Sequence, residues 1–170
     1  RRIGIDPMGK KFKQYYTDDI TLLPDFFSSA AYFSIEKRPA KIVTSIAMFY
    51  DLETPGAFAQ QVESVLADDG IWHFEQSYMP SMLRCNSYDT ICHEHLEYYS
   101  LGAVTKILNQ AGLKVVDVIM NNVNGGSFAV TATRVGNQGL TQNQAVINWL
   151  LEQEDRMGLN TPHPYLDFKE

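Results

Sequence analysis

The stretch AKIVTSIAMFYDL, residues 40–52, carries the strongest fold signal in the sequence. Its nearly continuous apolar run is typical of a strand buried on both faces, as in a parallel sheet. The following segment, residues 54–66, has Thr54 at the capping position, Pro55 at the first helical position and Asp-Asp-Gly after its end. These signals predict a well-bounded helix. A buried strand that leads into a helix indicates an α/β fold.

The rest of the chain continues this alternation. The expected strands are residues 3–5, 20–24, 70–77, 113–120 and 127–133, and the expected helices are residues 28–37, 101–111 and an amphipathic segment after 137. A Gly-rich turn joins the last two strands, which favours antiparallel pairing. In the last helix, Val146, Trp149, Leu150 and Met157 are expected to form the apolar stripe.

Composition limits the classes of function. The 170 residues are enough for one domain with a substantial core, and 45% of them are hydrophobic. A net charge of -6 argues against a nucleic-acid or anionic-membrane surface, because no basic field offsets phosphate repulsion. No apolar run approaches the ~18 residues that span a membrane. Cys85 and Cys92 form no CxxC motif and are expected to stay reduced, which favours a cytoplasmic location.

The organisation of the chain suggests a piece of a longer protein. It opens with Arg1 and Arg2 directly before an apolar run, without a Met. The composition changes after residue 136, so residues 1–136 are expected to be a partial α/β domain and residues 137–170 the start of a C-terminal region.

In open α/β sheets, ligands bind at the carboxyl ends of the strands. Asp6 directly follows the first expected strand, where a carboxylate can accept hydrogen bonds from both hydroxyls of a ribose. An ordinary Asp-Pro turn is the alternative. The end of the 40–52 stretch, from Met48 to Asp51, is expected to line the same cleft together with Ser45, and plain core packing is the alternative there.

The segment DTICHEHLEYYS, residues 89–100, concentrates groups that can transfer protons. His93 and His95 share a face only if the segment is extended, and Glu94 then points the other way. Zinc usually takes three or four protein ligands, and the spacing is not HExxH, so no metal is expected. A catalytic base is the favoured hypothesis, and a structural histidine is the alternative for any one residue.

The segments SYDTICHEHLEYYSLGAVTKILNQAGLKVVDV and VNGGSFAVTATR closely resemble the C-terminal part of the S-adenosylmethionine-dependent sugar C-methyltransferases. TSIAMFYDLETP and IGIDP fit the second half of a class I methyltransferase sheet, so the resemblance covers residues 3–134. It implies a Rossmann-like, mostly parallel sheet with an antiparallel end pair. The family's first strand, its Gly-rich loop and its N-terminal zinc-binding cysteines are absent. Cys92 and Met48 stand where family members often have Tyr and His.

The resemblance implies methylation of a keto-deoxysugar carried on a nucleoside diphosphate, with S-adenosylmethionine as the cofactor. His95 is the expected base that removes the proton beside the carbonyl, and an ordinary imidazole suits that role near neutral pH. Glu94 is expected to orient or polarise the site, and His93 to hold the loop or the enolate oxygen. Tyr98 and Tyr99 are expected to contact sugar hydroxyls or the diphosphate, with core packing as the alternative for one of them.

The resemblance also makes Asp6 the expected ribose contact, and Ser45 and Met48 complete the expected cofactor site. Substrate contacts are also expected from the turn formed by Asn124, Gly125 and Gly126, where bare backbone can approach a ligand; a tight hairpin is the alternative.

Two other functions remain open. One is a non-catalytic module that binds a nucleotide sugar or a partner chain, and the other is a hydrolase that holds a metal with His93 and His95. The expected partner is a nucleotide sugar. A sheet that lacks its first strand also exposes an edge that can pair with a second copy, so a homodimer is a further expectation.

Overall fold

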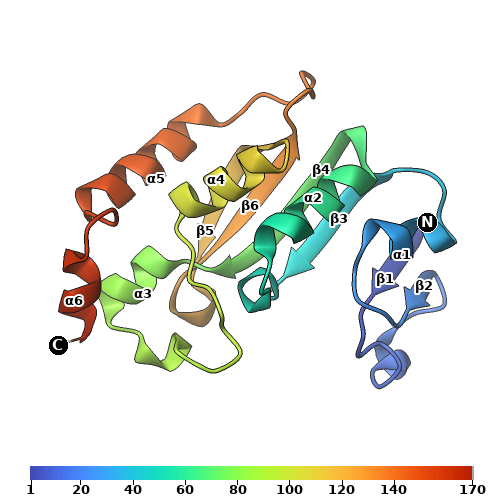
Figure 1. Cartoon of the computed structure of the whole chain (residues 1–170), viewed down its shortest axis with the longest axis horizontal. Coiled ribbons are helices and arrows are strands. Elements are labelled where there is room, and N and C mark those ends of the chain that lie inside the picture. Colours follow the sequence, from blue (N-terminus) through green and yellow to red (C-terminus); the bar gives the residue numbers. More distant parts are fainter. Residues whose placement is uncertain (170) are drawn as a thin grey trace.

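The computed structural model describes residues 1–169, which form two β-sheets with helices packed beside them (Figure 1). The strands are β1 (Arg2–Ile5), β2 (Ile20–Leu23), β3 (Ala40–Ile46), β4 (Leu66–Ser77), β5 (Leu113–Asn121) and β6 (Ser127–Arg134). The helices are α1 (Ser29–Ile35), α2 (Pro55–Val65), α3 (Met79–Cys85), α4 (Leu101–Gln110), α5 (Gln144–Arg156) and α6 (His163–Lys169). Short 3-10 turns are η1 (Lys13–Tyr15), η2 (Phe49–Asp51), η3 (Tyr88–Thr90) and η4 (Val123–Gly125).

The strand pairing confirms the predicted α/β architecture. β1 and β2 form a two-stranded parallel sheet, and a four-stranded sheet has the order β3-β4-β6-β5. β3 and β4 are parallel, whereas β6 runs antiparallel to both of its neighbours. β3, β4 and β5 therefore run in one direction, and the β5–β6 hairpin is the expected antiparallel pair at the end of the sheet.

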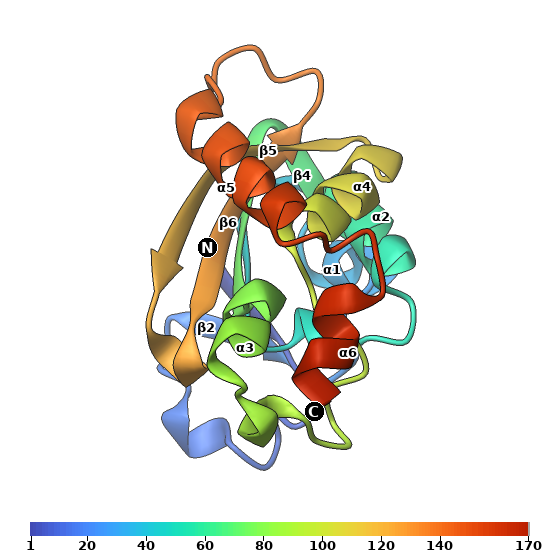
Figure 2. The same ribbon diagram turned by 90° about the vertical axis from the view of Figure 1, so that its left-hand side faces the viewer.

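The core lies on one face of the four-stranded sheet. Trp72 and Phe74 of β4 point toward the helices and are fully buried, together with Phe49 and Leu108. Figure 2 shows the helices gathered on this side of the sheet. Within the described chain no helix covers the opposite face, where Ile119 of β5 is 58% exposed.

The prediction that residues 40–52 form a strand buried on both faces is wrong. The strand exists as β3, but Ile42 is 64% exposed and Ile46 is exposed as well. The reason is tertiary, because β3 is the last strand of its sheet and its outer edge has no partner among residues 1–169. Ser45 faces the helices and is buried.

Two smaller expectations also differ. Asp68, Asp69 and Gly70 do not end the helix but lie inside β4, where a register shift brings Gly70 against the backbone of Ala40. Thr54 stands at the start of α2, but its side chain forms no capping hydrogen bond.

The stripe of the last helix is also different from the prediction. In α5 the buried residues are Ile147, Leu150 and Glu154, and Trp149 is 58% exposed. A spacing of three and four residues places these three on the face that packs against the core, and Trp149 falls outside that face. The predicted division after residue 136 stays a prediction, although Ile147 and Leu150 belong to the same hydrophobic core as the sheet.

No helix among residues 1–169 is long and apolar enough to cross a lipid bilayer. Cys85 and Cys92 are both free thiols on the surface.

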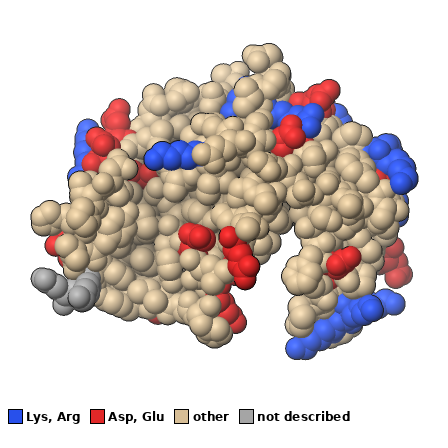
Figure 3. All heavy atoms as spheres, in the orientation of Figure 1, with Lys and Arg blue, Asp and Glu red and all other residues tan. Residues whose placement is uncertain are grey.

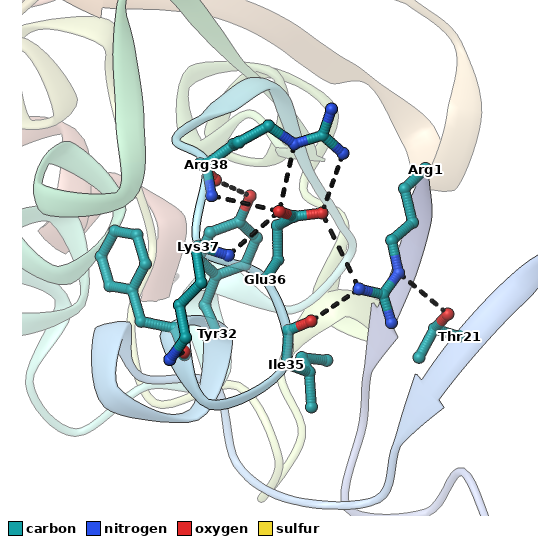
Figure 4. Close-up of polar contacts among 8 residues, drawn as sticks. Arg1, Thr21, Tyr32, Ile35, Glu36, Lys37 and Arg38 are labelled. Atoms are coloured by element: carbon teal, nitrogen blue, oxygen red, sulfur yellow. Dashed lines mark hydrogen bonds and ion pairs between the residues drawn. The ribbon is translucent and has the colours of Figure 1, made fainter.

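A charged cluster ties the N-terminal lobe, residues 1–25, to the segment that follows α1 (Figure 4). Glu36 accepts hydrogen bonds from the Arg38 guanidinium at 3.1 and 3.2 Å, and Arg1 lies 3.8 Å away. Arg1 also donates to the Ile35 carbonyl at 2.6 Å and to Thr21 Oγ1 at 3.3 Å. The hydrogen bond from Arg38 lowers the pKa of Glu36 to about 2.

A second carboxylate, Glu154, joins α5 to α4 and to the end of β4. It is 5% exposed and accepts the Tyr78 hydroxyl at 2.7 Å and the backbone N–H groups of Leu101 and Gly102 at 2.5 and 2.8 Å. These two amides are otherwise unpaired donors at the start of α4, where negative charge is favourable. Burial and the bond to Glu154 raise the pKa of Tyr78 above its ordinary value.

We expect the substitution Glu154→Leu to destabilise the fold by about 3 kcal/mol, because it leaves two buried donors and one partly buried donor without an acceptor. The matched control is Glu152→Gln on the same helix, where the exposed carboxylate lies 3.9 Å from Arg156. That change should cost less than about 0.5 kcal/mol. Urea unfolding followed by circular dichroism measures both, and equal losses would contradict the proposed role of Glu154.

The Glu36 cluster should make stability sensitive to acid. Because the pKa of Glu36 is lower in the folded chain than its ordinary 4.5, its contribution is present above pH 4.5 and is lost as the pH falls toward 2. Glu36→Gln should lower the urea midpoint at neutral pH and flatten its dependence on pH over that interval. Exposed Glu53, which lies outside the cluster, provides the control Glu53→Gln. An unchanged acid dependence in Glu36→Gln would refute the assignment.

Candidate active site

His95 is half-buried in the loop between α3 and α4, and its ring is held on two sides. Its Nδ1 lies 2.8 Å from the carbonyl oxygen of Thr90. Its ring centroid is 4.3 Å from that of Tyr50, and the ring of Tyr98 lies at 6.3 Å in an edge-on arrangement. Since a carbonyl can only accept, Nδ1 is the protonated nitrogen of the neutral ring, and Nε2 is then the nitrogen with the free lone pair.

The backbone of Tyr50 anchors this loop to the end of β3. The Tyr50 carbonyl accepts the N–H groups of both Leu96 and Glu97 at 3.0 Å. At the carboxyl end of the loop, just before α4, the Tyr99 carbonyl accepts the N–H of Met79 at 2.9 Å. Figure 1 shows the loop at the same end of the molecule as the carboxyl ends of β3 and β4, where ligands bind in open α/β sheets.

Ala47 lies in a strained conformation at this point of the chain. Its φ is 51°, in the left-handed region, and its N–H donates to the Glu75 carbonyl at 2.8 Å. A non-glycine residue there costs about 1–2 kcal/mol. The turn redirects the chain after β3. It thereby brings the ring of Tyr50, within η2, into contact with the ring of His95.

His93 and Glu94 lie differently from His95. The His93 side chain is 91% exposed, and its Nε2 is 3.9 Å from a carboxylate oxygen of Glu94, which is also exposed. The chain turns at these two residues, so it is not extended there, and the two histidines do not share a face. Of the three predicted catalytic residues, only His95 packs against the rest of the protein.

The two predicted substrate-binding tyrosines differ in how far they are buried. Tyr98 is half-buried beside His95, and its hydroxyl donates to the Thr90 carbonyl at 3.4 Å. Tyr99 is buried, and its ring stacks on Phe49 at 5.3 Å. Its hydroxyl has no hydrogen-bond partner within residues 1–169. Burial raises the pKa of Tyr99 above its ordinary value. The structure thus places Tyr99 in the core, the alternative to a ligand contact.

The turn at Asn124, Gly125 and Gly126 joins β5 to β6. Asn124 is left-handed with φ 51°, and both glycines have positive φ. A Cβ on Gly126 would lie 2.7 Å from the Cβ of Ser81, so glycine is required here by the protein's own packing. The Gly126 carbonyl accepts the N–H of Tyr78 at 3.0 Å, which fixes the hairpin against the end of β4.

Two of the three predicted cofactor residues lie on a groove between β1 and β3. Ser45 and Met48 line it, but Ser45 Oγ accepts the indole N–H of Trp72 at 2.9 Å. Asp6 lies at the end of β1, and its two oxygens accept the N–H of Met8 at 2.8 Å and the hydroxyl of Tyr16 at 3.2 Å. Figure 3 shows a notch that separates the N-terminal lobe from the main body.

Tyr50 and Asp51 lie in the segment from Met48 to Asp51 that was expected to line the cleft, although neither was given a role, and Thr90 was not predicted as a site residue. Burial raises the pKa of Asp51. The electrostatic interaction with His95 lowers this pKa and the interaction with Glu94 raises it, so both residues act on the Asp51 carboxylate. The sequence signal for Tyr50 and Asp51 is their position, because both come shortly after the strand at residues 40–46. In the part of the chain that the structure describes, no three His, Cys, Asp or Glu side chains are grouped to hold a metal ion.

Comparison with known proteins identifies the family. The model of the methyltransferase domain matches residues 3–118, more than half of the chain. The chain belongs to the methyltransferase-domain family. This confirms the resemblance at the level of methyltransferases, whereas the sugar substrate stays a prediction.

Individual relatives agree with this family. The chain is 28% identical over 170 residues to C-methyltransferase NovU of Streptomyces niveus, which covers 99% of the chain. The chain spans 40% of the length of that relative.

Solved structures share the fold. LepI in complex with SAM has a TM-score of 0.60 and 12% identity, over 79% of this chain and 36% of LepI. The magnesium protoporphyrin IX methyltransferase ChlM of Synechocystis PCC 6803, with bound SAH, has a TM-score of 0.55 and 13% identity, over 78% of this chain and 63% of its own. The predicted class I methyltransferase-like fold is therefore confirmed.

The contact between His95 and Thr90 predicts the tautomer of this histidine. At a pH where both are neutral, His95 should carry its proton on Nδ1, because the Thr90 carbonyl offers only an acceptor. Multiple-bond ¹⁵N–¹H NMR distinguishes the two ring nitrogens. His93, whose side chain is largely in solvent, is the internal control and should show the mixture of free imidazole. A proton on Nε2 of His95 would contradict this geometry.

Proposed function

We propose that the chain forms part of an S-adenosylmethionine-dependent C-methyltransferase that acts on a nucleotide-linked keto-deoxysugar. The observation that carries the proposal is the arrangement of His95, whose Nδ1 is committed to the Thr90 carbonyl and whose ring is packed on Tyr50. Such an imidazole presents one basic nitrogen in a fixed direction. The identity to a C-methyltransferase supports transfer to carbon, a reaction that needs a base.

His95 acts as the general base in this proposal. Its Nε2 takes the proton from the carbon beside the sugar carbonyl, and the electron pair of that C–H bond passes into an enolate. The imidazole becomes a cation, which the Thr90 carbonyl and the nearby Asp51 carboxylate stabilise. S-adenosylmethionine, when bound, supplies the electrophilic methyl group. The close, tilted contact with the Tyr50 ring keeps the imidazole from turning away during the proton transfer.

The residues around the groove suit such a cofactor. Asp6 supplies a carboxylate at the carboxyl end of β1, where it can accept hydrogen bonds from ribose hydroxyls. Its present partners are a backbone N–H and a tyrosine hydroxyl, so both oxygens already face donors. Met48 and Ile5 add apolar surface in the same groove, which suits the adenine and the sulfonium side of the molecule. Ser45 contributes packing, because its hydroxyl is turned to Trp72.

Charge at the surface supports a phosphorylated substrate. The N-terminal lobe carries the exposed residues Lys10, Lys11 and Lys13, and Figure 3 shows basic side chains at the tip of this lobe beside the notch. Lysine side chains attract a diphosphate through space even without fixed contacts. Tyr98, beside His95, is the nearest candidate for a sugar hydroxyl, since its phenol makes only a long hydrogen bond at 3.4 Å.

Proton exchange tests the base separately from methyl transfer. In D₂O, the natural full-length polypeptide should exchange the α proton of a nucleotide-linked keto-deoxysugar, followed by ¹H NMR, and should transfer the labelled methyl of S-adenosylmethionine. His95→Gln should slow both reactions about 100- to 10,000-fold, the usual contribution of a general base.

The matched variant is His93→Gln, two residues away and exposed, which should keep most of the exchange activity. Equal losses in both variants would show that the loop, and not the His95 imidazole, is required. Binding of the sugar without exchange in the unsubstituted protein would favour a non-catalytic binding module instead.

A further inference from the structure

The imidazole of His95 depends for its direction on a short segment of the loop, the turn η3. The Thr90 carbonyl, at the end of η3, lies 2.8 Å from Nδ1 of His95 and accepts the Tyr98 hydroxyl at 3.4 Å. A carbonyl group can direct a ring nitrogen only if its own position is fixed. The contacts that hold η3 in place therefore bear on the direction of Nε2, the nitrogen that carries the proposed chemistry.

Local hydrogen bonds give η3 its shape. Thr90 is buried, and both its N–H and its hydroxyl donate to the Ser87 carbonyl, at 3.3 and 2.8 Å. The N–H of Ile91 donates to the Tyr88 carbonyl at 3.0 Å. These bonds join close neighbours in the chain, so they preserve the turn but do not fix its position against the rest of the protein.

A contact between distant parts of the chain supplies that position. The ring of Tyr88, the first residue of η3, is stacked on the ring of Phe168 in α6, with centroids 4.4 Å apart and ring planes 13° from parallel. Stacked aromatic pairs add stability beyond the apolar area that they bury. Tyr88 is 49% exposed, so its side chain is not held by deep burial. The stack on Phe168 therefore contributes to the placement of η3.

The helix that carries Phe168 is itself fixed to the protein. α6 packs against α3, and Figure 2 shows it beside α3 and next to the loop that follows α3. The Pro162 carbonyl accepts the N–H groups of Tyr165 and Leu166 at 3.2 and 3.0 Å. Tyr165 also donates its hydroxyl to the Leu159 carbonyl at 3.0 Å. The stack on η3 thus has a firm support.

The two C-terminal helices reach the loop near both of its ends. Glu154 of α5 accepts the first two N–H groups of α4, directly after the loop. Phe168 of α6 stacks on Tyr88, near the beginning of the loop. His95 lies between these two points. A loop held at both ends has fewer conformations to lose, so a side chain between them is directed at a smaller cost in entropy.

We propose that Phe168 is a positioning residue for the base. Its ring fixes Tyr88 and with it η3, so that the Thr90 carbonyl stays aligned on Nδ1 of His95 and Nε2 points at the reacting carbon. In this arrangement Phe168 touches neither cofactor nor substrate and acts only through Tyr88. The inference rests on the proposed role of His95, but the orientation of the imidazole can be measured without any reaction.

The tautomer of His95 tests the role of Phe168 directly. In Phe168→Ala of the natural full-length polypeptide, multiple-bond ¹⁵N–¹H NMR should show the neutral ring shifting from a proton on Nδ1 toward the mixture of free imidazole. Phe168→Tyr keeps a ring that can stack, so it should keep the Nδ1 proton. A loss of stability alone would not move the tautomer, so this measurement separates positioning from a purely structural role.

Proton exchange gives the size of the effect. Phe168→Ala should lower kcat for exchange of the α proton in D₂O about 10-fold and leave KM within about twofold, because a displaced base slows the step without altering the binding of the sugar. Leu166→Ala is the matched control. It truncates a large apolar side chain on the same helix that is 56% exposed, and it should leave both constants and the tautomer unchanged.

The partner ring provides a second test. Tyr88→Ala should reproduce the loss of exchange activity. The double variant Tyr88→Ala/Phe168→Ala should lose no more than either single variant, because both changes remove the same contact. Urea unfolding verifies that each variant is folded. Phe168→Leu, which keeps apolar volume but no ring, takes the place of Phe168→Ala if that variant is unfolded.

Three results would overturn the proposal. The first is a folded Phe168→Ala or Phe168→Leu variant in which His95 keeps its Nδ1 proton. The second is an equal shift of the tautomer in Leu166→Ala. The third is a double variant in which the two single losses multiply, since Tyr88 and Phe168 would then act independently. An unsubstituted protein that exchanges no proton would refute the base chemistry of His95, whereas the tautomer would still decide the role of Phe168, so the two proposals fail separately.

Discussion

The buried carboxylate of Glu154 is the contact on which the placement of the site depends. It binds the Tyr78 hydroxyl at the end of β4 and the first two amides of α4, so three elements meet at one charged group. The loop that carries His95 runs between these same elements. With its far end fixed by Glu154 and its middle fixed by the Tyr50 carbonyl, the loop has a defined position on the carboxyl edge of the sheet.

The second constraint is the division of the strands into two sheets. The helices gather on one face of the larger sheet, and β3 is left with an open edge and an open face. This explains why an apolar strand exposes Ile42, although the hydrophobic effect favours burial. It also places Ile5 of β1 and Met48 after β3 on the lining of one groove, while Asp6 follows directly at the carboxyl end of β1.

The candidate site was partly predictable. A His-Glu-His segment before two tyrosines indicated proton chemistry, and His95 is indeed the histidine packed against the protein. The sequence did not show that His93 and Glu94 turn to solvent, because the local turn there depends on the anchors at both ends of the loop. The contact with Tyr50 joins residues 45 positions apart, and no local pattern reports such a distance.

The sequence by itself determined the type and order of the strands and of helices α1, α2, α4 and α5, because apolar periodicity and turn residues act over a few neighbours, whereas α3 and α6 were not expected. The strands at residues 2–5, 20–23 and 113–121 and the hairpin that follows lie where these local signals place them. Only the tertiary structure decided which surfaces are covered. Trp149 faces solvent because Ile147, Leu150 and Glu154 occupy the packed face of α5. β3 is exposed because its outer edge finds no strand within the described chain, and burial depends on neighbours that are distant in sequence.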